Sequence, residues 1–366
     1  MDAPLLESEI HREHGGEVFS WGRRLDLEAS EILDFSASIN PLGPPPSARK
    51  AFIKSYGELF HYPDGQGEEL KAALARRHGL NTGEVLLGNG STQLIYLICR
   101  ALRSRKALVV APAFSEYANA LKLAGTKIRY FFLDPDDGFK FSLGQFSAEW
   151  EKGPDVAFLA TPNSATGRLI SRTEIEEIAR MALKMKRFLV VDEAFMDFVE
   201  RESIKELVRE HPYLVVLRSL TKYYALPGLR LGYLLAQAQR VKQLLVHQEP
   251  WSVNGPAQRV ALACLADANF HFRTHEWLEK EKSFLFERLS GLKGLHPYRS
   301  DANFVLVRME KPGFTTLELR SFLMERKILI RACDSFLGLG AGYFRVAVRR
   351  RRENSLLLKA LKGLLG

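Results

Sequence analysis

The most informative part of the chain is Ser219-Leu220-Thr221-Lys222-Tyr223-Tyr224-Ala225-Leu226-Pro227-Gly228-Leu229-Arg230-Leu231-Gly232-Tyr233. It lies between two apolar runs, 214–217 and 231–235, that are typical of buried strands. Lys222 would therefore stand at the carboxyl end of a strand, where open α/β sheets bind their ligands. Burial and cationic neighbours would lower the pKa of this lysine, so that its free amine could attack an aldehyde.

The apolar runs on either side of this motif predict the fold of the region. Between about residue 84 and residue 236, short apolar runs alternate with helical stretches, as in a mostly parallel sheet that is buried on both faces. The predicted strands are Val85–Leu87, Ala107–Ala111, Ile128–Leu133, Val156–Ala160, Phe188–Val191, Leu214–Leu217 and Leu231–Leu235. We therefore expect an α/β domain built on a seven-stranded sheet.

The pattern changes after Trp251. The predicted helices there are Pro256–Ala266, His275–Leu292, Thr316–Arg326 and one from Glu353, and the predicted strands are Asn303–Val307, Ile328–Arg331 and Tyr343–Val348. They indicate a small α+β domain. Residues 40–46, Asn-Pro-Leu-Gly-Pro-Pro-Pro, cannot be helical and predict an extended N-terminal arm. The expected division is an arm at 1–45, a large domain at 46–250 and a small domain at 251–366.

Composition narrows the class of protein. The chain has 366 residues, of which 46% are hydrophobic, and this excludes a disordered, collagen-like or disulfide-stapled protein. Three scattered cysteines and the lack of a signal peptide or an 18-residue apolar run favour the reducing cytoplasm. The net charge of +9 suits any anionic partner. Its densest run, 349–352, follows a predicted strand, so we expect the solvated start of a helix, with neither a nucleic acid nor a membrane as partner.

The residues around Lys222 suggest a specific ligand. Ser219, Thr221 and Arg230 offer two hydroxyls and a planar cation, which suit a phosphate monoester. An aldehyde and a phosphate on one molecule describe pyridoxal phosphate. For such a motif taken alone, a surface turn with a solvated lysine is the more frequent explanation, so further support is needed.

Three other elements supply that support. Residues 88–92, Gly-Asn-Gly-Ser-Thr, follow a strand and open a helix, so they can cradle an anion. Asp192 ends an apolar strand, where a protonated pyridine nitrogen would stabilise its carboxylate. Phe114 can stack on a ring, although plain core packing explains it equally well.

Taken together, these passages resemble the fold-type I pyridoxal-phosphate enzymes of the class I/II aminotransferase superfamily. The resemblance covers nearly the whole chain and also rests on residues 14–16, 34–43, 217–222, 250–254 and 345–349. Within that superfamily the chain is similar to the threonine-phosphate decarboxylases of cobalamin biosynthesis, which are close to the histidinol-phosphate aminotransferases.

The resemblance implies a role for each matching residue. Lys222 would bind the cofactor covalently and Asp192 its pyridine nitrogen. The cofactor phosphate would be held by Ser91, Thr92, Ser219 and Arg230. Tyr62 would reach the site of a neighbouring subunit, which implies a homodimer. Arg345 would grip the substrate carboxylate, while Arg331, His14 and Asn40 would meet the substrate's other anionic end. The alternatives are a surface cation for Arg331 and solvated loop residues for His11 and His14. No third ligand accompanies His11 and His14, so we expect no metal.

Two positions depart from the superfamily pattern. Alignment on Thr166-Gly167 puts Ser164 where relatives use an asparagine for the cofactor's 3′-oxygen, and Asn163 lies one place early. Phe195 stands where many aminotransferases use a tyrosine for the same oxygen. Either Asn163 or Ser164 could contact this oxygen, and the sequence leaves the choice open.

The implied reaction is decarboxylation of L-threonine O-3-phosphate to (R)-1-aminopropan-2-ol O-phosphate. The alternative is an aminotransferase that acts on histidinol phosphate or a similar phosphorylated or acidic amine. A pyridoxal-phosphate-binding regulator without turnover is disfavoured, because Lys222, Asp192 and Arg230 are all present.

Overall fold

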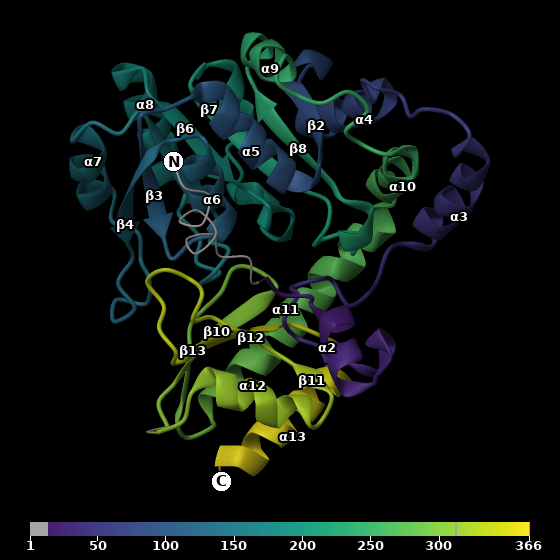
Figure 1. Cartoon of the computed structure of the whole chain (residues 1–366), viewed down its shortest axis with the longest axis vertical. Helices are drawn as coiled ribbons and strands as arrows, with labels where there is room; N and C mark the ends of the chain where they lie inside the picture. The colour runs from purple at the N-terminus through teal and green to yellow at the C-terminus, as the bar shows by residue number, and fades with distance from the viewer. Residues whose placement is uncertain (1–13, 312, 366) are drawn as a thin grey trace, which may run out of the picture.

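The computed structural model describes residues 14–311 and 313–365, so His11 lies outside the described residues. The chain folds into a large upper lobe and a smaller lower lobe, and helix α11 (Ala268–Ser290) runs from one to the other (Figure 1). Within the described part, no helix is both long enough and apolar enough to span a membrane.

The large lobe contains the predicted sheet. Its seven strands lie in the order β2 (Val85–Asn89), β8 (Leu231–Ala236), β7 (Leu214–Ser219), β6 (Phe188–Asp192), β5 (Val156–Ala160), β3 (Lys106–Ala111) and β4 (Lys127–Phe132). Strand β8 runs antiparallel to both of its neighbours, and the other strand pairs are parallel. The α/β prediction is therefore confirmed, with strand ends shifted by at most two residues.

Helices cover both faces of this sheet, which explains why its strands, apart from the edge strand β4, are mostly apolar and buried. One face packs against α5 (Gly90–Leu102), α6 (Ser115–Leu123) and α9 (Ala238–Leu245). The other face packs against α4 (Glu68–His78), α7 (Leu143–Glu151) and α8 (Arg172–Met185). The large lobe also carries α3 (Pro46–Ser55) and α10 (Gly255–Leu265) at one side.

The small lobe is more elaborate than predicted. Its antiparallel sheet has the order β12 (Arg331–Ala332), β13 (Tyr343–Ala347), β10 (Phe304–Met309) and β9 (Leu295–Pro297), flanked by α12 (Thr316–Met324) and α13 (Arg351–Leu365). The prediction of one strand over 328–331 is wrong. Its first half, β11 (Ile328–Leu329), pairs in parallel with β1 (Leu33–Asp34) of the arm, whereas β12 pairs with β13.

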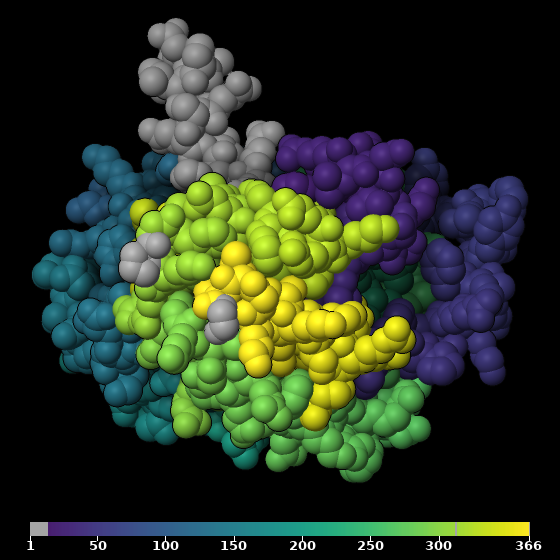
Figure 2. Space-filling view, turned by 90° about the horizontal axis from the view of Figure 1, so that it is seen from below, coloured from purple at the N-terminus to yellow at the C-terminus, as the bar shows by residue number. Residues whose placement is uncertain are grey.

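The arm is not extended throughout. Residues Val18–Leu25 form helix α2, which lies beside the small lobe (Figure 2). Its Val18 and Trp21 pack with Met324 and Leu329. The predicted boundaries at 45 and 250 stay a prediction.

The basic run 349–352 lies at the start of α13 with Arg350, Arg351 and Arg352 exposed, as predicted, but it also makes specific contacts. The Arg349 guanidinium donates to the Asp34 carbonyl oxygen at 2.9 Å, and Arg350 donates to the Pro41 carbonyl oxygen at 3.0 Å. Arg351 pairs with Glu281 at 3.0 Å. These arginines tie the arm and α11 to the small lobe.

Candidate active site

Lys222 lies in the loop between β7 and β8, with its side chain half-buried. Its pKa is lowered to about 8, chiefly by burial; Asp192 opposes this shift, and Arg230 and Arg345 add to it. About a tenth of this amine is therefore uncharged at pH 7 and available as a nucleophile, far more than for an ordinary lysine.

Asp192 ends β6 as a buried carboxylate. The Tyr117 hydroxyl donates to Asp192 Oδ2 at 2.5 Å, and the Ala194 amide donates to Oδ1 at 2.9 Å. Burial raises the pKa of Asp192, and these two donors and Lys222 act against that rise. Sequence reasoning missed Tyr117, although its place three residues after Phe114, on the first turn of a helix, was a usable signal.

The predicted phosphate residues converge around the start of α5. Gly90 has φ +73°, and a Cβ built there would lie 2.6 Å from Arg230 Nη2, so the missing side chain admits the guanidinium. Ser91 is buried in the first turn of α5 and Thr92 follows it. The hydroxyls of Ser219 and Thr221 lie 2.8 Å apart. These donors, grouped at a helix N-terminus, can hold an anion.

The two candidates for the cofactor's 3′-oxygen differ in what they already bind. Asn163 Nδ2 donates to the Pro112 carbonyl oxygen at 2.9 Å, and its Oδ1 accepts from the amides of Ala165 and Thr166. The Ser164 hydroxyl is buried and has no hydrogen-bond partner among the described residues. Ser164 is therefore the better-placed donor for a ligand, and either contact stays a prediction.

These residues fit pyridoxal phosphate. They provide an amine of lowered pKa, a buried carboxylate for a ring nitrogen, an anion cradle and an unpartnered hydroxyl. Phe114 lies half-buried before α6, and Phe195 packs edge-on against Phe304 with ring centroids 5.2 Å apart. We call Lys222, Asp192, Ser219 and Arg230 the cofactor end of the site.

The substrate end, defined as His14, Asn40, Arg331 and Arg345, comes from the arm and the small lobe. Arg345 and Arg331 are cross-strand partners on β13 and β12. The Arg345 guanidinium lies 4.4 Å from the Phe304 ring centroid and donates to the Ser164 carbonyl oxygen. The pKa of Arg345 is lowered to about 10, chiefly by burial and in part by nearby Arg331. The buried Arg331 donates to Ser335 Oγ at 2.9 Å.

The two arm residues are placed differently. Asn40 is buried, and its Nδ2 donates to the Tyr223 carbonyl oxygen at 2.9 Å and to Thr274 Oγ1 at 3.0 Å, so it holds the lysine loop. Its direct contact with substrate stays a prediction. His14 Nε2 lies 3.1 Å from a carboxylate oxygen of Glu116.

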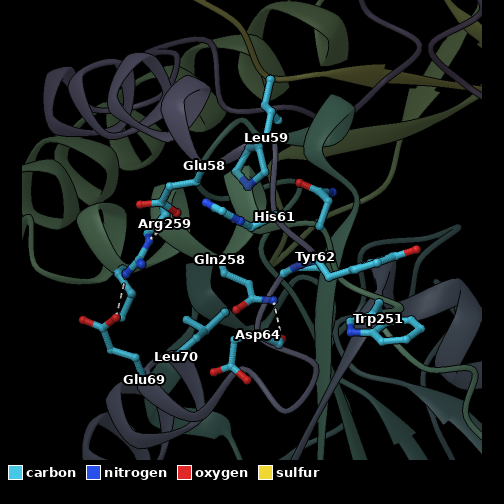
Figure 3. A pocket seen from close by; sticks show the side chains of 15 residues that line it. Glu58, Leu59, His61, Tyr62, Asp64, Glu69, Leu70, Trp251, Gln258 and Arg259 are labelled. Atoms are coloured by element: carbon cyan, nitrogen blue, oxygen red, sulfur yellow. Dashed lines mark hydrogen bonds and ion pairs between the residues drawn. The ribbon is translucent and has the colours of Figure 1, made fainter.

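Tyr62 is not brought to Lys222 within this one chain. It is 78% exposed and stacks on Trp251, with ring centroids 4.6 Å apart. Both line a cavity of about 710 Å³, in which Arg259 bridges Glu58 and Glu69 (Figure 3). This cavity holds none of the residues of the cofactor end or the substrate end.

A buried cluster of charged side chains lies behind the cofactor end, on the opposite face of the sheet. The sequence did not predict this cluster. Arg218 Nη1 lies 2.9 Å from Glu193 Oε2, and Nη2 lies 3.2 Å from Asp197 Oδ1. Because strand residues alternate between faces, Arg218 and Glu193 lie on the opposite face from Ser219 and Asp192. The ion pair thereby fixes the ends of β6 and β7.

Comparison with known proteins identifies relatives across the whole chain. The profile of the aminotransferase class I and II family matches residues 30–361. Threonine-phosphate decarboxylase from Salmonella typhimurium is 37% identical, over 96% of this chain and 96% of its own length. Histidinol-phosphate aminotransferase from Roseiflexus castenholzii is 34% identical, over 93% of this chain and 91% of its own. The crystal structure of L-threonine-O-3-phosphate decarboxylase from Porphyromonas gingivalis has a TM-score of 0.81 and 27% identity, covering 91% of this chain and 99% of that one.

Proposed function

The chain belongs to the aminotransferase class I and II family, and from that premise we propose that it is a pyridoxal-phosphate enzyme that decarboxylates L-threonine O-3-phosphate. The product is (R)-1-aminopropan-2-ol O-phosphate, made for cobalamin biosynthesis. The similarity to the Salmonella decarboxylase over 96% of the chain supports this assignment.

The observation that carries the proposal is the pair of arginines beside Lys222. Arg345 is close enough to Lys222 to lower its pKa, and Arg331 lies directly across from Arg345 on the neighbouring strand β12. L-Threonine O-3-phosphate carries an amine, a carboxylate and a phosphate, and so offers an anion to each arginine. Histidinol phosphate has no carboxylate and would leave one of these cations without an anionic partner.

The side chains account for the choice of bond. When bound, pyridoxal phosphate supplies an electron sink for the electron pair that is released as the bond from Cα to the carboxylate breaks. Arg345, fixed by Phe304 and the Ser164 carbonyl, holds the carboxylate so that this bond is the one oriented for cleavage. Lys222 Nζ can deliver the proton that replaces the departing CO₂ at Cα.

Product analysis with L-threonine O-3-phosphate and no keto acid tests the proposal. We expect CO₂ and the aminopropanol phosphate in equal amounts, and neither from the Lys222→Ala variant. An aminotransferase, the function of the Roseiflexus relative, would instead release no CO₂, need a keto acid and convert the cofactor to its pyridoxamine form.

The active species in this proposal is a homodimer in which Tyr62 completes the neighbouring subunit's phosphate site. Support comes from an exposed apolar strip on α3 and the segment after it, at the side of the large lobe (Figure 1). Its members are Phe52, Ile53, Tyr56, Leu59, Phe60 and Tyr62. Exposed apolar surface of this kind marks protein interfaces. Sedimentation that finds a fully active monomer at assay concentration would refute the dimer.

The proposed compartment is the cytoplasm. Cys99, Cys264 and Cys333 are buried free thiols, as expected in a reducing environment.

A further inference from the structure

We propose that Glu116 is a positioning residue, which holds the His14 imidazole of the arm at the phosphate end of the substrate pocket. This inference rests on the proposed function, because it assigns His14 to the phosphate of a phosphorylated amino acid.

The backbone next to His14 has a tightly defined place. A Cβ at Gly15 would overlap the carbonyl oxygen of Ser36, and Gly16 has φ +88°, so both positions require glycine. The Gly16 amide donates to Ser36 Oγ at 2.8 Å, and Ser36 Oγ donates to Asp34 Oδ1 at 2.6 Å. The arm is therefore fixed on one side of His14, and the imidazole needs one more contact to be oriented.

Glu116 provides that contact. It is buried in the first turn of α6, and its Oε1 lies 3.1 Å from His14 Nε2 and 3.0 Å from Asn119 Nδ2. The Tyr96 hydroxyl donates to Oε2 at 2.6 Å. Burial raises the pKa of Glu116, but the hydrogen bonds from His14, Tyr96 and Asn119 outweigh it, so the pKa is lowered and the group stays a carboxylate. The carboxylate holds the ring at Nε2, which fixes the orientation of the imidazole and leaves Nδ1 for a contact with the substrate.

The first turn of α6, which carries Glu116, relates the contact between Glu116 and His14 to both the cofactor end and the substrate end. The His14 ring centroid lies 5.5 Å from that of Phe114, and Tyr117 in the same turn binds Asp192. A neighbouring cavity of about 400 Å³ is lined by Phe114, Ser115, Asn119 and Ser335. Ser335 is also the partner of Arg331. Because Arg345 is assigned to the carboxylate, we expect His14 and Arg331 to bind the substrate's other anionic group.

A double-mutant cycle on the holoenzyme tests the role of Glu116. The Glu116→Gln variant should raise KM for L-threonine O-3-phosphate about tenfold, the effect of weakening one charged hydrogen bond. We expect kcat to change by less than about threefold, with cofactor content and melting temperature unchanged. In a His14→Ala background the Glu116→Gln change should have no further effect on KM. The matched control is Glu151→Gln, the same substitution at an exposed glutamate at the end of α7, which should leave KM unchanged.

Two results would overturn the inference: an unchanged KM in Glu116→Gln, or KM effects of Glu116→Gln and His14→Ala that multiply. If Glu116→Gln does not fold, Glu116→Asp, which keeps the charge but shortens its reach, takes its place in the cycle. If the wild type releases no CO₂, the proposed function fails, and the cycle is repeated on the dissociation constant of L-threonine O-3-phosphate from the visible absorption of the cofactor. If the effects of Glu116→Gln and His14→Ala on this dissociation constant are coupled, the role of Glu116 is supported. If the effects are independent, or if the wild type does not bind this ligand, that role is excluded.

Discussion

Lys222, Asp192 and Ser219 at the cofactor end lie at or just after the ends of neighbouring strands of one sheet. The substrate end is assembled from distant parts of the chain, since His14 meets Glu116 and Asn40 meets Thr274. The residues for the reactive chemistry are therefore set by single strand ends, whereas the choice of substrate depends on how the arm and the small lobe pack. Substitutions at the two ends should accordingly separate loss of the cofactor from loss of the substrate.

The largest effect is expected at the cofactor end from Lys222→Ala. Loss of the amine should lower CO₂ release by at least about 10⁴-fold, because both the covalent attachment and the proton donor are removed. The absorption spectrum should lose the band of the lysine-linked cofactor. A variant that keeps this band together with more than a tenth of wild-type turnover would break the assignment of Lys222.

A second prediction at the cofactor end concerns the rate at which the apoenzyme binds pyridoxal phosphate at different pH values. With a pKa of about 8 in place of the ordinary 10.5, the amine of Lys222 is about 300-fold more available at pH 7. Stopped-flow capture of pyridoxal phosphate by the apoenzyme should therefore rise about tenfold per pH unit below pH 7.5 and level off above about 8.5. Because Asp192 raises this pKa, Asp192→Asn should move the midpoint to lower pH. A rate that still climbs at pH 10 would show an unperturbed lysine.

At the substrate end, Arg345→Ala should lower kcat by about 100-fold while the cofactor content stays full. The loss follows from removing both a charge-assisted contact and the orientation of the scissile bond. Arg326→Ala, at an exposed arginine of the same lobe, is the matched control and should retain wild-type rates. If Arg345→Ala instead loses its cofactor, substitutions at the substrate end do not separate loss of turnover from loss of the cofactor.

The smallest effect is expected from Tyr117→Phe, which removes one donor from Asp192. The dissociation constant of pyridoxal phosphate should rise about fivefold, the effect of one hydrogen bond, with KM for substrate unchanged. Fluorescence titration measures it, and Tyr213→Phe, whose ring packs on Phe188 at 5.4 Å, is the control. Equal affinities in the two variants would remove Tyr117 from the cofactor end.

The same contrast explains what the sequence could predict. The sheet strands were found to within two residues because burial on both faces makes most of them nearly continuously apolar. Lys222 and Asp192 were found because they follow such strands directly. Helix α2 was missed because eight residues are marginal as an isolated helix, and this one packs against Met324 and Leu329. Glu116 was missed for a related reason, since its partner His14 is distant in sequence and no periodic pattern reports that contact.

The decarboxylase proposal is tested most directly by running the reaction on L-threonine O-3-phosphate in D₂O and locating the hydrogens of the product by mass spectrometry and NMR. Cleavage of the bond from Cα to the carboxylate predicts an aminopropanol phosphate that keeps the substrate's α-hydrogen and gains one solvent deuterium at the same carbon. Loss of the original α-hydrogen with the carboxylate retained would mean that the enzyme breaks the other bond, and would contradict the proposed reaction.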